Sequence, residues 1–487
     1  MSDGQQINQT GFENVEVGRD LNATVHQTVI QQSDASKPIP SDMPQGSKHF
    51  VERDGENDVT LQKIYEKLKE NQGVIVCAVE GMGGVGKTEL ALQYAAKYQN
   101  KYIAQYFLSL RESTLGREVI RLASPYIPLP EPLKSESVEK QAAWYWKNWL
   151  PDQGEMLVIL DDVTDSGNIP ERLMPRDPRV KVLITTRRQK LRLGFESLKL
   201  EMLSEAKAVA MLKSILGGPR VEAEIKMVKA ICKTLGYLPL GLELVGEYLW
   251  QNEHLSFADL QEQLSLADES LARERPGKRY GQKGVAAAMQ LSWENLSTAA
   301  QQVAMWLGLF APVEICWDLV VELGAVVELS SAEFKPVRNE LNRLHLIKPT
   351  NPKGDFYTLH SLVHDFLRDK LAAAEQNQLY RQGFVTGLLD KAKSMPQTPD
   401  LTKIAEMTPI IPHLEWLSQE MLGDIENPGE DSNLVWTFAG VAWFYHGQGA
   451  LFIGRETLSS LFSCNKKNTG RAPSRCGSEY EQPRPFV

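Results

Sequence analysis

The segment from Gly81 to Thr88 reads GMGGVGKT, and its residue types and spacing suit phosphate binding. Glycines let backbone N–H groups turn inward around phosphate oxygens, the lysine adds a positive charge, and the threonine hydroxyl can bind Mg²⁺. An apolar run at 74–79 precedes the segment and a helical pattern at 90–98 follows it. This order of strand, loop and helix predicts a P-loop rather than a flexible surface loop. The N-terminus of the following helix would add to phosphate binding, because it attracts anions. The predicted nucleotide ligands here are Gly81, Gly83, Gly84, Val85, Gly86, Lys87 and Thr88.

Two acids, Asp161 and Asp162, directly follow the uninterrupted apolar run at 156–160. Such a run is typical of a parallel strand buried on both faces, with its carboxyl end at the ligand crevice. We predict a Walker B strand, in which Asp161 holds Mg²⁺ through water, together with Thr88, and Asp162 orients the attacking water. Two acids that merely open a loop are the alternative.

Arg187 follows a third predicted strand, Val180 to Ile184. A guanidinium stays charged and matches the geometry of phosphate oxygens, so Arg187 is predicted to reach a γ-phosphate. A solvated basic turn is the other interpretation. The three candidates for a catalytic role are therefore Asp161, Asp162 and Arg187.

With two further motifs, the sequence resembles the NB-ARC branch of the STAND signalling ATPases over about residues 49–372. FVERD at 50–54 is similar to the family's entry motif, and the resemblance implies that the region of Arg53 contacts the base. GYLPLGL at 236–242 is similar to the GLPL motif, which implies that Pro239 packs near adenine. Taken alone, the second motif would be an ordinary turn between helices.

YTLHSLVHDF at 357–366 resembles the family's MHD element, which implies that His360 touches the β-phosphate of ADP. Ser361 stands where the family usually has aspartate, and a lone histidine here would otherwise be a packed side chain. The resemblance implies a switch that binds ADP at rest, exchanges it for ATP with Mg²⁺, and forms homo-oligomers. Hydrolysis is expected to be slow.

A winged helix is predicted within 281–372, where helical patterns precede a hairpin. In the family this fold acts as a movable lid, but in many proteins it reads DNA. A DNA-binding transcriptional regulator under nucleotide control is therefore the alternative function. The candidate recognition helix, 333–344, has only a weak positive excess, with Lys335, Arg338 and Arg343 against Glu333 and Glu340. Nucleic acid is therefore not the expected partner.

The predicted fold is an α/β P-loop NTPase, a parallel sheet wrapped by helices, followed by helical domains. Apolar strands alternate with helical stretches in the first half, and helical patterns dominate the second. We expect six segments: a polar leader (1–48), a P-loop NTPase domain (49–215), a helical domain (216–280), a winged-helix domain (281–372), a helical linker (373–430) and a partial tetratricopeptide repeat with an aberrant tail (431–487).

The two ends of the chain differ from the rest. Period-two alternation at 15–17 and 21–25 predicts either a β-arc, with an amyloid-like effector role, or a disordered leader. WTFAGVAW at 436–443 has the spacing of a tetratricopeptide (TPR) helix, so this region is predicted to bind protein partners. The tail after about residue 450 lacks that pattern, and the hypotheses are a frameshift in a longer repeat array or an ordinary disordered terminus.

Composition favours an intracellular regulator. The net charge of −9 gives no general reason to bind nucleic acid or an anionic membrane. The five cysteines are odd in number and lack metal-ligand spacing, which predicts reduced thiols. The sequence shows no signal peptide, and acids interrupt the longest apolar region, 307–329, so no membrane span is expected. We predict a cytoplasmic protein.

Overall fold

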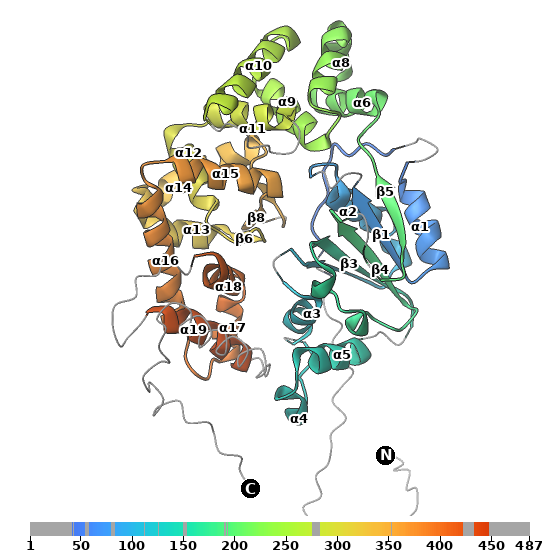
Figure 1. The fold of residues 1–487 in the computed structure, drawn as a ribbon, viewed down its shortest axis with the longest axis vertical. Helices are drawn as coiled ribbons and strands as arrows, with labels where there is room; N and C mark the ends of the chain where they lie inside the picture. The colour runs from blue at the N-terminus through green and yellow to red at the C-terminus, as the bar shows by residue number, and fades with distance from the viewer. Residues whose placement is uncertain are drawn as a thin grey trace, which may run out of the picture. The chain divides into compact units, whose positions relative to one another are not determined.

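The computed structural model (Figure 1) describes residues 41, 43–53, 58–78, 83–111, 113–124, 126–149, 153–188, 191, 193–274, 283–351, 353–421 and 433–447. The predicted β-arc of the leader, Gly81 of the phosphate loop and the tail after residue 450 lie outside the described residues.

Five parallel strands form one sheet in the order β2-β3-β4-β1-β5. They are β1 (Gly73–Ala78), β2 (Ala104–Ser109), β3 (Met156–Val163), β4 (Val180–Thr186) and β5 (Glu196–Leu200). Every residue of β4 is buried and β3 has a single half-buried residue, which explains why aliphatic residues predominate in both strands. The predicted α/β fold is thus confirmed, and the ends of β1, β3 and β4 meet at one edge of the sheet.

Helices pack against this sheet and complete a sheet domain, defined here as β1–β5 with α1–α5. The helices are α1 (Leu61–Glu70), α2 (Lys87–Lys97), α3 (Leu115–Ala123), α4 (Glu131–Lys134) and α5 (Val138–Asn148). α1 and α2 contact β1 and β4, whereas α3 contacts β2 and α5. α2 begins directly after Gly86, so the phosphate loop leads into the helix N-terminus as predicted.

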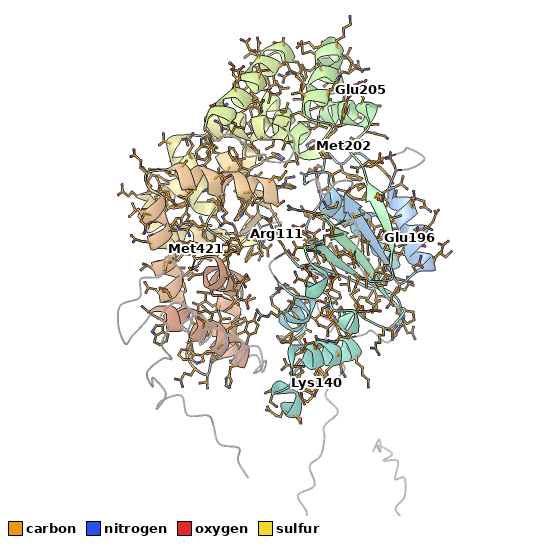
Figure 2. All side chains as sticks on the ribbon, viewed as in Figure 1. Arg111, Lys140, Glu196, Met202, Glu205 and Met421 are labelled. Atoms are coloured by element: carbon orange, nitrogen blue, oxygen red, sulfur yellow. The ribbon has the colours of Figure 1, made fainter. Side chains whose placement is uncertain are left out.

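A group of helices follows β5, and Met202 and Glu205 lie where the chain passes into it (Figure 2). It consists of α6 (Glu205–Leu216), α7 (Gly218–Ala223), α8 (Ile225–Thr234), α9 (Pro239–Gln251), α10 (Phe257–Glu274) and α11 (Lys283–Glu294). Pro239 occupies the first turn of α9, where its missing N–H costs no hydrogen bond. The expected helical character of this region is confirmed.

The next group contains a small antiparallel sheet in the order β6-β8-β7. Its elements are α12 (Thr298–Leu307), β6 (Ile315–Cys316), α13 (Trp317–Leu323), η5 (Gly324–Val327), α14 (Ser331–Arg343), β7 (Lys348–Pro349), β8 (Phe356–Thr358) and α15 (Ser361–Ala373). Pairing of β7 with β8 confirms the predicted hairpin. The winged-helix assignment stays a prediction, and we call these elements the α12–α15 group.

The last described elements are helices: α16 (Asn377–Lys393), α17 (Leu401–Met407), α18 (Ile411–Glu420) and α19 (Asn433–Gly447). α19 contacts both α16 and α18, and its Trp436 and Trp443 rings lie 5.6 Å apart, edge to face. A tetratricopeptide identity for α19 stays a prediction. No helix within the described residues is long and apolar enough to cross a membrane. Cys77, Cys232 and Cys316 are free thiols.

Candidate functional site

A cavity of about 990 Å³ brings together the edge of the sheet, the start of α9 and the segment from β7 to α15. Most of the residues predicted from sequence line it: Arg53, Gly83, Gly84, Gly86, Lys87, Thr88, Asp161, Asp162, Arg187, Pro239 and His360. Val85 is buried behind the wall and Gly81 is outside the described residues. Residues spread over more than three hundred positions of sequence therefore share one site.

The phosphate loop requires glycine for two reasons. Gly84 and Gly86 have φ angles of +77° and +91°, which L side chains rarely adopt. A Cβ at Gly83 would lie 3.3 Å from the Leu362 side chain, and a Cβ at Gly84 would lie 3.4 Å from Leu240 Cβ. The loop is thus packed between α9 and α15, and its backbone N–H groups fit a phosphate cradle.

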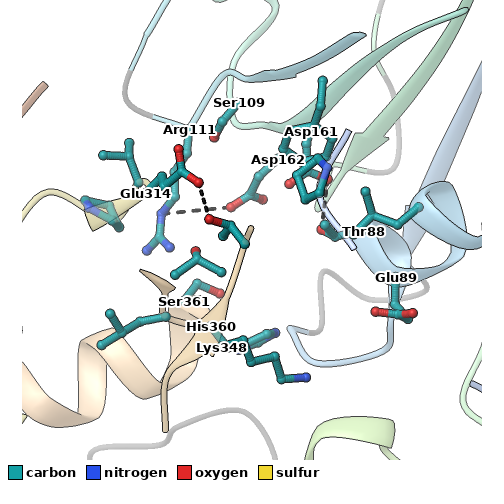
Figure 3. Close-up of a pocket in the computed structure, with 18 of the residues that line it drawn as sticks. Thr88, Glu89, Ser109, Arg111, Asp161, Asp162, Glu314, Lys348, His360 and Ser361 are labelled. Atoms are coloured by element: carbon teal, nitrogen blue, oxygen red, sulfur yellow. Dashed lines mark hydrogen bonds and ion pairs between the residues drawn. The ribbon is translucent and has the colours of Figure 1, made fainter. Parts of the chain in front are cut away.

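Thr88 and Asp161 form the predicted metal-binding pair. Thr88 Oγ1 donates to Asp161 Oδ1 at 2.8 Å, and Thr185 Oγ1 donates to the same oxygen at 2.6 Å. Burial and the nearby Asp162 raise the pKa of Asp161 to about 6, although both hydroxyls and Lys87 oppose this rise. A hydroxyl beside a carboxylate is a set of oxygen ligands that suits Mg²⁺. The residues therefore fit the cation that the P-loop motif implies (Figure 3).

Asp162 lies on a distorted part of β3. Its φ is +49°, and the pairing of β3 with β4 shifts register between Leu160 and Val163. Such a bulge re-aims a side chain, and the Asp162 backbone N–H donates to Thr185 Oγ1 at 2.9 Å. Arg187 Nε lies 3.3 Å from Asp162 Oδ1. The predicted γ-phosphate ligand and the predicted water-orienting acid are thus ion-paired.

Arg111, which sequence reasoning missed, also faces Asp162. It follows the end of β2 at the same sheet edge, and its Nε lies 3.9 Å from Asp162 Oδ2 (Figure 3). Its Nη2 lies 3.8 Å from Asp365 Oδ1 on α15. Figure 2 places Arg111 on the side of the sheet domain that faces the α12–α15 group. A signal was present in the sequence, because Arg111 follows the apolar run of β2 as Arg187 follows that of β4.

Lys87 and His360 present different kinds of donor to the cavity. Burial and Arg187 lower the pKa of Lys87, while Asp162 and Asp161 act to raise it. His360 Nδ1 accepts from the Leu362 backbone N–H at 3.2 Å. Burial, Lys348 and further cations lower the His360 pKa to about 3, so the ring is neutral at pH 7. The proton of that neutral ring then resides on Nε2, which can donate to a phosphate oxygen.

Arg53 and Pro239 pack on the phosphate loop. Arg53 Nη2 donates to the carbonyl oxygens of Val85 at 2.9 Å and Glu201 at 3.2 Å. Burial lowers the pKa of Arg53 to about 10, although Asp58 acts to raise it. Pro239 Cγ lies 3.7 Å from the position of a Cβ at Gly86. Arg53 therefore fixes the backbone of the loop, and contacts of Arg53 and Pro239 with the base stay predictions.

A charge cluster that the sequence did not predict joins α9 to the segment after α14. Lys348 Nζ donates to both Glu243 carboxylate oxygens, at 2.6 and 2.7 Å. His345 Nδ1 lies 3.2 Å from Glu243 and Nε2 lies 3.3 Å from Glu247. Burial acts to raise the pKa of Glu243, but Lys348 and His345 lower it to about 2. The signal in the sequence was an acid at 243 flanked by leucines in a largely apolar helix, because a buried charge needs partners.

Comparison with known proteins identifies relatives of the sheet domain and beyond. Residues 57–220 match the NB-ARC domain. The regulatory protein AfsR of Streptomyces griseus is 26% identical over 364 residues, which cover 72% of this chain and 35% of the relative. A probable disease resistance protein of Arabidopsis thaliana, At4g33300, is 24% identical over 336 residues, covering 63% of this chain and 37% of the relative. The chain spans about a third of the length of these relatives.

Among solved structures, the chain is similar to a STAND protein with a tetratricopeptide repeat sensor from Pyrococcus horikoshii. The sequence identity is 16%, the match covers 88% of this chain and 60% of that chain, and the TM-score is 0.47.

Proposed function

Because this chain belongs to the NB-ARC family of STAND-type P-loop NTPases, we propose that it is a signalling switch that binds ADP at rest and ATP with Mg²⁺ when active. One observation carries this proposal. Leu362 of α15 and Leu240 of α9 lie over the phosphate loop so closely that a Cβ added at Gly83 would be 3.3 Å from Leu362, and one added at Gly84 would be 3.4 Å from Leu240. A change in the ligand of the loop would therefore alter how the loop packs against α9 and α15, and a nucleotide switch requires such a link.

The closed state depends on residues from three parts of the chain. Lys87 and Thr88 hold the diphosphate from the sheet domain, Pro239 packs on the loop from α9, and His360 Nε2 donates to the β-phosphate from the start of α15. ADP bound in this way stabilises the closed arrangement by RT ln(1 + [L]/Kd), since only that arrangement assembles all the donors.

The third phosphate of ATP is proposed to act through Arg187. This guanidinium pairs with Asp162 in the structure, and sharing it with a γ-phosphate would weaken that pair. Arg111, which faces both Asp162 and Asp365, would transmit the change to α15. The open arrangement then assembles into homo-oligomers. For a near-complete change of population, ATP must favour the open state by about 5 kcal/mol.

Slow ATP hydrolysis returns the switch to rest. Thr88 and Asp161 would hold Mg²⁺, which would supply positive charge to the phosphate oxygens. Asp162 orients the attacking water. It lies beside Arg187, the proposed γ-phosphate ligand, and so is close to where that water would attack. The ion pair restrains the Asp162 carboxylate, and this restraint is our explanation for a low turnover.

The first test is the identity of the nucleotide retained by the purified protein. The protein is denatured, and the released nucleotide is identified by ion-exchange chromatography, with Lys87→Ala as control. We expect stoichiometric ADP in the wild type and none in the variant. Protein that contains no nucleotide, and gains none on incubation with ADP, would overturn the proposal.

The second test addresses the proposed role of Asp162. Asp162→Asn should retain ADP but hydrolyse ATP more slowly, and should stay oligomeric for longer after ATP addition, as measured by light scattering on a sizing column. Hydrolysis at the wild-type rate would remove Asp162 from the mechanism.

A DNA-binding regulator is the alternative, since two Streptomyces relatives are named regulatory proteins. One candidate DNA contact, Arg338, contacts other residues of the α12–α15 group. Arg338 of α14 lies 5.9 Å from the ring centres of both Trp317 and Tyr357, and its Nη1 donates to the Gly354 carbonyl at 3.4 Å. Salt-dependent binding to a DNA duplex in the ATP state, measured by fluorescence anisotropy, would favour this alternative.

The switch proposal also includes protein partners. We propose that α16–α19 bind them in the manner of tetratricopeptide repeats.

A further inference from the structure

Lys348 lies on the wall of the nucleotide cavity but outside every motif described above. It begins β7 and pairs in register with Thr358, two residues before His360. Its side chain is 39% exposed, whereas that of its partner Glu243 is 8% exposed. The buried Glu243 carboxylate therefore holds the Lys348 amine in place, while the Lys348 side chain stays accessible at the cavity wall.

The bonds to Glu243 leave one N–H donor of the Lys348 amine for a ligand. A lysine ammonium has three N–H donors, and the two hydrogen bonds to Glu243 account for two of them. His345 Nδ1 lies 3.2 Å from the same carboxylate, so Glu243 is fixed from a second direction. A lysine held in this way loses little rotamer freedom when it binds an anion, which favours affinity.

The charge of Lys348 acts on two neighbouring residues of the site. After burial, it is the largest cause of the lowered pKa of His360. It also opposes the rise that burial produces in the pKa of Glu89, the residue after Thr88 on α2. Figure 3 draws Lys348 beside His360, away from the carboxylates of Asp161 and Asp162. The positive charge therefore acts on the part of the cavity wall formed by His360 and Glu89.

We propose that Lys348 is a direct ligand of the nucleotide diphosphate, contributed by the α12–α15 group. This inference rests on the proposed function, because it concerns the same nucleotide. It accounts for Glu243, since a buried carboxylate beside a polyphosphate would repel it unless a cation stood between them. The diphosphate is then held by Lys87 from the sheet domain and by Lys348 and His360 from the α12–α15 group.

The test compares ADP with adenosine by isothermal titration calorimetry. Lys348→Gln should weaken ADP binding about tenfold, the effect of losing one charged hydrogen bond, and leave adenosine binding unchanged. His345→Gln is the matched control, because it disrupts the same charge cluster and keeps the amine. Its ADP affinity should fall much less. ADP binding by Lys348→Gln that equals the wild type would overturn the inference, as would an equal loss for adenosine or in the control.

A second measurement uses the wild-type protein and so does not depend on the folding of a variant. Acetylation of Lys348 by an amine-reactive reagent, followed by mass spectrometry, should be slowed by ADP and not by adenosine. Equal labelling with both ligands would overturn the inference. Failure of the wild type to bind ADP in either experiment would instead refute the proposed function.

Discussion

His345→Gln should remove a pH-dependent contribution to the stability of the interface between α9 and the segment after α14. Both ring nitrogens of His345 face carboxylates, at 3.2 Å from Glu243 and 3.3 Å from Glu247. A ring that donates from both nitrogens is an imidazolium. Two further basic side chains face the same acids, with His49 Nε2 3.8 Å from Glu247 and Lys348 Nζ 2.6 Å from Glu243. The φ of His345 is +55°, an unfavourable backbone conformation that these contacts offset.

The expected magnitude follows from the pKa of His345. Burial acts to lower this pKa, but Glu243 and Glu247 outweigh it and raise the value from 6.5 to about 9. At 1.36 kcal/mol per unit, the difference corresponds to about 3 kcal/mol. Because the folded-state pKa lies above the unfolded value, the contribution is fully present below about pH 6.5 and is lost as the pH rises through about 9.

The assay is urea unfolding of the wild type and His345→Gln, followed by tryptophan fluorescence at several pH values between 6 and 10. The difference in unfolding free energy between the two proteins should shrink by about 3 kcal/mol across this range. Titrations of groups that both proteins share and that lie far from His345 cancel in the difference. A difference that stays constant with pH would mean that His345 is not an imidazolium in the folded protein, and would refute the reasoning.

Three further predictions concern the loop, the metal site and the C-terminal helices. Gly86→Ala forces an L side chain to φ +91°, at a cost of about 1 kcal/mol or more, and should reduce the ADP retained after purification; undiminished retention would contradict it. Thr185→Val removes a 2.6 Å hydrogen bond to Asp161, so the pKa of Asp161 should rise further and the acid limb of the ATPase pH profile should move to higher pH; an unmoved limb would count against this role. Arg117→Met removes the guanidinium 3.2 Å from Glu415, a carboxyl whose pKa burial already raises, and should speed limited proteolysis within α17–α19, with unchanged cleavage as the contrary result.

The sheet was predictable where burial is complete on both faces of a strand. The aliphatic residues of β3 and β4 are typical of strands in the interior of a parallel sheet. β5 was missed because only Leu198 and Leu200 of its five residues are buried. An edge strand with two apolar residues gives too short a period-two pattern to recognise. The strand ends also differed, since β3 continues through Asp161 and Asp162 instead of ending before them.

The site was predictable where its residues share a local motif. Lys87 and Thr88 complete one glycine-rich motif, and Asp161 directly follows an apolar run whose strand character is evident. Glu243 and Lys348 are 105 residues apart and neither lies in a phosphate-binding pattern. Their contact is decided by how α9 packs against β7, which no local periodicity encodes. A buried acid in a largely apolar helix predicts that a partner exists but not which residue it is.

α15 carries a carboxylate at Asp365, whereas position 361 at its start is a serine. Ser361 stands where the family's motif usually has aspartate, and it is buried and uncharged at the start of α15. Asp365 lies one helical turn later, 3.8 Å from Arg111, and its pKa is lowered because hydrogen bonding and nearby cations outweigh burial. Arg111 in turn lies 3.9 Å from Asp162. Asp365 is thus the carboxylate of α15 that faces Arg111, and Arg111 lies between it and Asp162, the proposed water-orienting acid.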